Sequence, residues 1–242
     1  MGTLLQLSLR QLAGRRRLLL LIISLAALPV AVAAILTGLV DGGGSYRSSF
    51  VNGLLDGMIV AGVLPIVTMT LATAAFGHEL EDHTLGYLVL NPIPRWWIAL
   101  AKFLASVLVA GPLLIASGVA TILLGLDLDW QTAATVAASL LVGVVTYSAI
   151  FTWAGLMTTR ALSFALVYVF LWEGVTTTFL GGVRYLSVRG YTLALLHGFD
   201  GEVFDTLGSR AIELPAALVG AVVVTFLFFW LTVRRLRRMD VA

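Results

Sequence analysis

Six long apolar runs limit what this chain can fold into. They cover residues 18–40, 50–76, 96–124, 132–157, 163–180 and 215–233. An α-helix rises about 1.5 Å per residue, so runs of this length reach across a hydrocarbon core of about 30 Å. Because that core holds no water, the backbone there must satisfy its own hydrogen bonds, as a helix does. We therefore predict an all-α polytopic membrane protein with six transmembrane helices, forming a single transmembrane domain over residues 1–242.

The composition agrees with a membrane protein. Of the 242 residues, 60% are hydrophobic and only 12% are charged, whereas about a quarter of the residues of a soluble domain are charged. The chain has no cysteine, which excludes disulfides and thiolate metal sites. Its net charge is only +2, and its cations cluster at the ends of the apolar runs. That pattern indicates membrane topology, so we expect no nucleic-acid partner.

Residues 1–17 combine leucines with polar residues and end in the triplet Arg15, Arg16 and Arg17. We interpret them as a cytoplasmic amphipathic segment that the arginines hold at the membrane surface. A frayed tail is the alternative. A cleaved signal peptide fits less well, because the run 18–40 is longer than a signal core and no clear small-x-small cleavage site follows it at the right distance.

The distribution of cations predicts which side each loop faces. With six spans, both chain ends lie on the same side of the membrane. The cations on that side are Arg10, Arg15, Arg16, Arg17, Arg95, Lys102, Arg160, Arg234, Arg235, Arg237 and Arg238. The other side holds Arg47, Arg184, Arg189 and Arg210. Lysine and arginine are concentrated in cytoplasmic segments. We therefore predict that both termini and the 77–95 loop are cytoplasmic, and that the 181–214 insert is on the outer side.

The 77–95 loop is the main polar interruption of the chain. Its first part holds the acids Glu79, Glu81 and Asp82 and the histidines His78 and His83. Zinc proteases place two histidines four residues apart on one helix face. Here they are five apart, which separates them by about 140° on a helix. We therefore expect no metal site, and interpret Glu79 and His83 as a surface pair at helical spacing.

The second part of the loop turns apolar and then stops. Leu85 and Leu88 lie at helical spacing, and Pro92 and Pro94 end the helix because proline lacks an amide proton. Arg95 and two tryptophans then mark the return of the chain into the membrane. We interpret the loop as a short amphipathic helix at the cytoplasmic surface, placed so that a partner could push it.

This loop carries a resemblance to a known family. The sequence T-L-G-Y-L, then P-I-P-R and a later lysine, is similar to the loop after the second span of type-2 ABC export permeases. That family also has six spans, a basic amphipathic N-terminus and a long outer insert before the last span. The chain departs from the pattern at His83, where glycine is common. The matching residues are Glu79, Glu81, Asp82, Thr84, Leu85, Tyr87, Leu88, Pro92, Ile93, Arg95 and Lys102.

The resemblance implies a permease subunit of an ATP-driven exporter in the plasma membrane of a prokaryote. Such a subunit forms the translocation pathway as a dimer, with a second copy or a homologue, among membrane lipids. The 77–95 loop would be its coupling helix on a separate ABC ATPase. The contacts would come from Glu79, Glu81, Asp82, His83, Thr84, Leu85, Tyr87 and Leu88.

The sequence agrees with a separate ATPase on one point. No Gly-x-x-x-x-Gly-Lys-Ser/Thr motif occurs in the chain, and its single lysine, Lys102, has no such context. We therefore expect that this chain binds no cofactor and is not an enzyme by itself, and that ATP and Mg bind the partner subunit.

Two carboxylates, Asp56 and Glu173, lie inside predicted spans. Charges there are costly and usually face a cavity or a partner, so both are candidates for the translocation pathway. Alternatively, Asp56 is solvated near the outer end of its span, and Glu173 bonds Thr176 or Thr177. We predict a re-entrant or interfacial helix in the 181–214 insert, with a structured loop without substrate contact as the alternative.

Other functions remain open. An ion-coupled secondary transporter would use Asp56 and Glu173 as proton carriers, but the spans lack the paired broken helices of inverted repeats. A membrane enzyme would need a convergent set of catalytic groups that the sequence does not present. A pure assembly subunit is a further alternative. Apolar spans with few charges favour a hydrophobic drug, lipid or peptide as the substrate.

Two further patterns predict local structure. Pro65 and Pro112 predict kinks, because each removes a backbone hydrogen bond inside a span. Small residues permit helices to approach closely. The glycines predicted to do so are Gly38, Gly62, Gly118, Gly143, Gly155 and Gly220.

Overall fold

The computed structural model describes residues 2–13, 16–39, 44–81, 94–126, 130–158, 160–176 and 181–238, and its regular structure there is helical. The first half of the chain forms α1 (Gly2–Ala13), α2 (Arg16–Leu39), α3 (Gly44–Phe50), the π-helix η1 (Val51–Val63), α4 (Leu64–Glu81) and α6 (Arg95–Leu126). The second half forms α7 (Trp130–Met157), α8 (Ala161–Val167), the π-helix η2 (Tyr168–Thr176), the 3₁₀ helix η3 (Gly181–Leu186), α10 (Val188–Phe199), the 3₁₀ helix η4 (Asp205–Leu207) and α11 (Leu214–Arg238).

Five helices in the described residues are long and apolar enough to cross a membrane. They are Arg16–Gly38, Tyr46–Gly77, Arg95–Leu126, Trp130–Met157 and Leu214–Arg238. The prediction of an all-α polytopic membrane protein is confirmed. A shorter apolar helix, Ala161–Gly174, occupies the start of the predicted span 163–180. Residues 177–180 lie outside the described residues, so the count of six spans stays a prediction.

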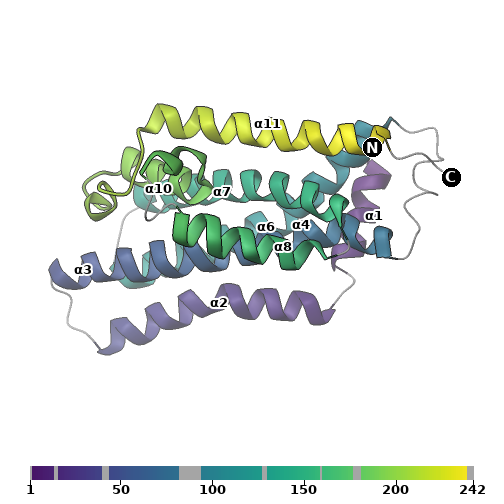
Figure 1. The fold of residues 1–242 in the computed structure, drawn as a ribbon. Coiled ribbons are helices and arrows are strands. Elements are labelled where there is room, and N and C mark those ends of the chain that lie inside the picture. Colours follow the sequence, from purple (N-terminus) through teal and green to yellow (C-terminus); the bar gives the residue numbers. More distant parts are fainter. Residues whose placement is uncertain are drawn as a thin grey trace.

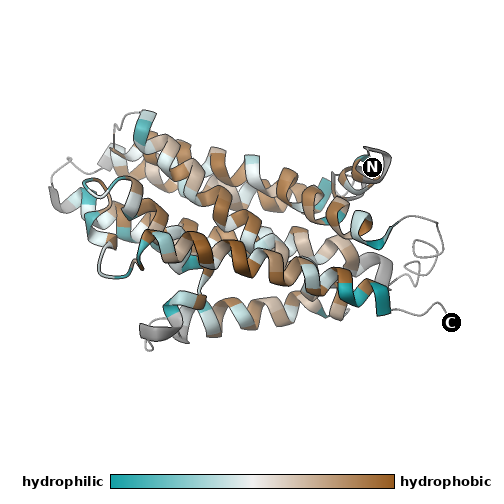
Figure 2. Ribbon diagram, turned by 90° about the horizontal axis from the view of Figure 1, so that it is seen from above, coloured by the Kyte–Doolittle hydropathy of each residue, from teal (hydrophilic) through white to brown (hydrophobic). Residues whose placement is uncertain are grey.

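The long helices run side by side and define two ends of the molecule (Figure 1). α1 and the C-terminal end of α11 lie at one end, and α3 and α10 lie at the other. Hydrophobic residues cover the middle of the helices, whereas polar residues collect towards both ends (Figure 2). This distribution is the one expected of a bundle whose long axis crosses a membrane.

α7 is the centre of the bundle and packs against α4, α6, α10 and α11. Its contact with α4 depends on Gly155, where a Cβ atom would lie 2.6 Å from the carbonyl oxygen of Thr73. Gly143 lies close to the side chains of Leu64 and Thr192. Gly118 and Gly220 also lie against neighbouring helices, so the prediction of close packing is confirmed for these four glycines. It is wrong for Gly38 and Gly62, since nothing lies within 4 Å of Gly38 and only a backbone atom of its own helix lies near Gly62.

The prolines have different surroundings. α6 continues without interruption through Pro112. Pro65 is the second residue of α4 and directly follows the end of η1, where the amide of Leu64 donates to the carbonyl of Ile59. Pro65 therefore lies where the hydrogen bonding changes from π-helical to α-helical, and the kinks at Pro65 and Pro112 stay predictions.

Gly155 provides a test of this packing. We expect Gly155→Ala to lower stability by about 1–3 kcal/mol, or the melting temperature by roughly 3–10 °C, because backbone atoms of α4 cannot move aside as a side chain can. Gly38→Ala is the matched control. It should leave the melting temperature unchanged or slightly raised, since alanine favours a helix. Equal melting of both variants in detergent would contradict the close approach of α4 and α7.

Candidate functional site

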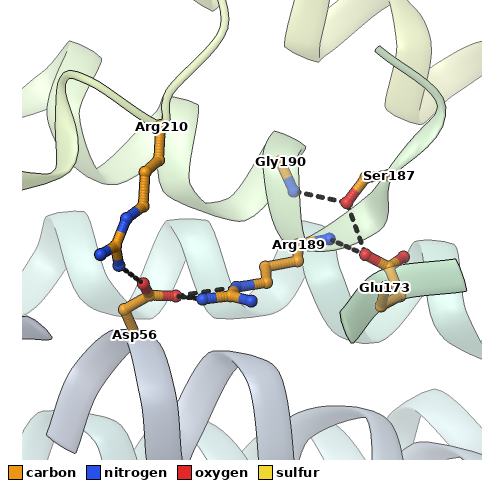
Figure 3. Close-up of polar contacts among 6 residues, drawn as sticks. All are labelled: Asp56, Glu173, Ser187, Arg189, Gly190 and Arg210. Atoms are coloured by element: carbon orange, nitrogen blue, oxygen red, sulfur yellow. Dashed lines mark hydrogen bonds and ion pairs between the residues drawn. The ribbon is translucent and has the colours of Figure 1, made fainter. Parts of the chain in front are cut away.

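Asp56 is a fully buried carboxylate with two arginine partners. It lies in η1 with a side-chain exposure of 0%. The Nε atom of Arg189 donates to its Oδ1 at 2.8 Å, and Nη2 of the same arginine lies 2.7 Å from that oxygen. Nη1 of Arg210 donates to Oδ2 at 2.8 Å. Both oxygens of Asp56 are therefore engaged by the segment after Gly181 (Figure 3).

Glu173 is the second buried carboxylate, and it caps α10. It lies in η2 and is 2% exposed. Its carboxylate accepts from the Ser187 hydroxyl at 2.5 Å and from the amides of Val188 at 2.9 Å and Arg189 at 3.4 Å. Ser187 is the N-cap of α10 and accepts from the amide of Gly190. The first amides of a helix lack partners within the helix and carry partial positive charge, so a carboxylate is stabilised there.

Arg189 joins the two carboxylates into one cluster. Its backbone amide faces Glu173, and its guanidinium faces Asp56 (Figure 3). Two carboxylates and two guanidiniums balance in charge, which offsets the cost of removing ions from water. We call Asp56, Glu173, Arg189 and Arg210, together with Ser187, the buried charge cluster. Both acids lie in π-helical stretches, a geometry that occurs often at functional sites.

α10 is held between three other helices by this cluster and by apolar packing. It contacts η1, α7 and α11. The Tyr191 ring lies against Gly220 of α11, and Thr192 lies against Gly143 of α7. Just beyond α10, Thr132 donates to the Asp200 carboxylate at 2.6 Å. The helix predicted in the insert is therefore present as α10, and it is buried between the long helices.

The sequence predicted the two acids but not their partners. Asp56 is 0% exposed, so the alternative that it is solvated near the end of its span is wrong. A place for Asp56 and Glu173 in the pathway stays a prediction. Sequence reasoning missed Ser187, Arg189 and Arg210 as partners. One signal in the sequence could have found them. An acid inside a span needs a cation as its partner, and three of the four cations predicted on the outer side lie in the insert.

The predicted ATPase contact falls at the opposite end. Glu79 and Glu81 belong to the last turns of α4, which continues through Gly77 without a break. Residues 82–93 lie outside the described residues, so Asp82, His83, Thr84, Leu85, Tyr87, Leu88 and Pro92 are not placed.

The chain resumes at Pro94, whose carbonyl accepts from the amide of Trp97 at the start of α6. Arg95 then donates to the carbonyls of Leu236 and Arg237, both at 2.7 Å. Those carbonyls are among the last of α11 and have no partner within that helix, so a cation is favourable there. Arg95 thus fastens the segment after the loop to the end of α11. Lys102, about two turns further along α6, is buried with its Nζ 5.7 Å from the centre of the Phe76 ring.

Two further observations bear on chemistry and substrate. Among the described residues, no group of three His, Cys, Asp or Glu side chains forms a metal site. A groove of about 330 Å³ lies between α7 and α11, and its lining is almost wholly apolar. It is lined by Leu141, Val142, Val145, Thr146, Ala221, Val222, Thr225 and Phe226. Such a lining suits a hydrocarbon chain. The hydroxyls of its two threonines are already engaged, because Thr225 donates to Thr146 and Thr146 donates to the carbonyl of Val142.

The fold defines a polytopic helical membrane protein with a buried charge cluster at one end. The family model described as ABC-2 family transporter protein matches residues 14–183, well over half of the chain. The chain belongs to this ABC-2 transporter membrane family. It is a permease component of an ABC transporter, which takes part in transport and is not itself catalytic. No curated protein matches it. The match includes Asp56 and Glu173 and ends before Ser187, Arg189 and Arg210.

The contact between Glu173 and Ser187 can be measured by a double-mutant cycle. We expect Glu173→Gln and Ser187→Ala to be coupled by about 1–3 kcal/mol, because the first removes the charge and the second the hydroxyl donor of a buried, charge-assisted hydrogen bond. Unfolding in mixed micelles would give the free energies. Ser187→Ala combined with Glu202→Gln, at an exposed acid of the same insert, should be additive. Additivity in both pairs would show that the hydroxyl and the carboxylate do not interact.

Proposed function

We propose that this chain is the permease subunit of an ATP-driven exporter, which pairs with a second permease and is moved by a separate ABC ATPase. The observation that carries the proposal is membership of the ABC-2 transporter membrane family over residues 14–183. Permeases of this family usually work with an ABC ATPase. The lack of a phosphate-binding loop in the sequence supports the placement of ATP and Mg on that partner.

The helices joined to the 77–95 loop could transmit its movement through the bundle. α4 continues from η1 and ends in the acids Glu79 and Glu81, so one helical run joins the loop to Asp56 at the other end of the bundle. On the far side of the loop, Arg95 ties the start of α6 to the last carbonyls of α11. A push on the 77–95 loop would therefore act on three long helices together. Rigid-body movement of this kind is a common route for switching between conformations.

The ion-coupled alternative gains no support from the cluster. A proton carrier must release and bind protons during transport, whereas Asp56 is shared by two arginines and Glu173 by Ser187 and two amides. Such contacts stabilise the charged carboxylate. For Asp56, which is paired with both arginines, they favour a structural role within an exporter.

The proposed topology places both termini in the cytoplasm of a prokaryote and the insert outside. Because the chain has no cysteine, single introduced cysteines report on it cleanly. We expect Thr206→Cys, exposed in the insert, to react with a membrane-impermeant maleimide on whole cells. Gln6→Cys, exposed on α1, should react only after permeabilisation. Labelling of position 6 on intact cells would contradict the topology.

The ATPase contact is tested by purification from native membranes. We expect an ATPase with a phosphate-binding loop to co-purify with the tagged chain in mild detergent. The combined variant Glu79→Lys, Glu81→Lys and Asp82→Lys should lose it, because three charge reversals would repel a basic docking groove. Glu202→Lys with Asp205→Lys, at the opposite end of the bundle, is the matched control and should keep it.

The outcomes separate the possibilities. Loss from the loop variant alone supports both the exporter and this loop as the contact. Equal recovery with every variant keeps the exporter but refutes the loop. If no ATPase is recovered under detergent conditions shown to preserve membrane complexes, the exporter proposal fails. Transport driven by a pH gradient then becomes the next measurement.

A further inference from the structure

The apolar groove between α7 and α11 opens on the outside of the bundle, near the middle of the membrane. α11 runs along one edge of the bundle (Figure 1) and is the least buried of the five candidate spans in the described residues. Val222 and Phe226 of α11 line the groove and are 54% and 69% exposed. On α7, Thr146 in the groove lies about 16 Å from Met157 at the end of the helix. One leaflet of a hydrocarbon core is about 15 Å deep, so the groove lies about one leaflet away from the end of the bundle with the termini.

A row of exposed side chains leads along α11 from the groove to that end. Phe226, Trp230 and Arg234 follow one another at intervals of four residues, so each is the neighbour of the next on the helix surface. The Cζ atom of Arg234 lies 5.0 Å from the centre of the Trp230 ring, which holds the cation against the aromatic face. Phe226 and Arg234 are about 12 Å apart along the helix axis, slightly less than the depth of one leaflet.

The order of chemistry along this row matches a phospholipid. The groove suits a hydrocarbon chain, and tryptophan is enriched where the hydrocarbon meets the headgroups. The guanidinium of arginine presents several donors in a geometry that fits a phosphate. Arg235, Arg237 and Arg238 add further positive charge at the same end of α11. On the proposed topology this end lies at the cytoplasmic leaflet, where anionic lipids are attracted to basic segments. An anionic headgroup is therefore favoured over a zwitterionic one.

A second copy of the chain suits this face less well. Paired membrane subunits are related by a two-fold axis, so an interface here would place the same surface of both copies in contact. The arginines at the end of α11 would then face their own copies. Like charges at close range destabilise a contact, whereas a negatively charged headgroup would neutralise them.

We propose that the groove and this row form a binding site for one anionic phospholipid, with an acyl chain between α7 and α11 and the phosphate at Arg234. Because α11 has few contacts within the chain, a lipid that touches both helices would hold it against α7. The site requires no ATPase, so it stands apart from the proposed export function.

Native mass spectrometry of the purified full chain tests the headgroup contact. The chain is titrated with phosphatidylglycerol or with phosphatidylcholine of the same acyl chains. We expect phosphatidylglycerol to bind at least about fivefold more tightly, the factor that one arginine near anionic lipid contributes. Arg234→Gln should lose most of this preference. Arg235→Gln removes the same charge about 100° away around the helix and should keep it. Equal loss in both variants would overturn the site, because it would show only diffuse surface charge.

The groove is tested by filling it. We expect Val222→Trp to weaken phosphatidylglycerol binding roughly tenfold, because the new ring occupies the space of the acyl chain. Val223→Trp is the matched control, since Val223 is 57% exposed and is not part of the groove lining. It should bind the lipid as the unchanged chain does. Both variants should keep their melting temperature in lipid-free detergent.

Two results would overturn the lipid site. Unchanged binding in Val222→Trp would show that no acyl chain occupies the groove. Conversion of dimers to monomers by Val222→Trp, with lipid binding unchanged, would show instead that the groove is an interface between copies of the chain.

Discussion

The absence of water from a membrane interior is the constraint on which this structure depends. It requires backbone groups to bond within helices, which accounts for the five long apolar helices among the described residues. It also requires any charge at that depth to find a partner. Asp56 and Glu173 meet this requirement through a segment that lies more than a hundred residues from one of them, since Asp56 and Arg189 are separated by 133 positions.

Close packing around α7 turns these helices into one body. Without a hydrophobic driving force between helices in lipid, contact area and small residues decide how they associate. Gly155 brings the backbone of α4 against α7, and Gly220 makes room for the ring of Tyr191 between α10 and α11. α10 is therefore held by shape on two sides and by charge on a third.

The two ends of the molecule differ in chemistry. At the end with the termini, Arg95 caps α11 and the acids of α4 lie beside the loop proposed to meet an ATPase. At the other end, the buried charge cluster balances two acids with two arginines. One helical run, from α3 through η1 to α4, connects the ends. This continuity is a physical route along which a push at the loop would reach Asp56.

Much of this architecture can be derived from the order of the residues. Length and hydropathy identify the helical membrane class, cations predict the topology, and the motif around Thr84 and Arg95 indicates the transporter family. These features are local, because each depends on residues close together in the chain. The partners of Asp56 and Glu173 are not local. Arg189 and Arg210 lie 133 and 154 positions from Asp56. Whether either arginine reaches this acid depends on how distant segments of the chain are packed and rotated. Gly38 and Gly155 look alike in the sequence, yet only Gly155 meets another backbone, because only the packed bundle determines which side of a helix faces a neighbour.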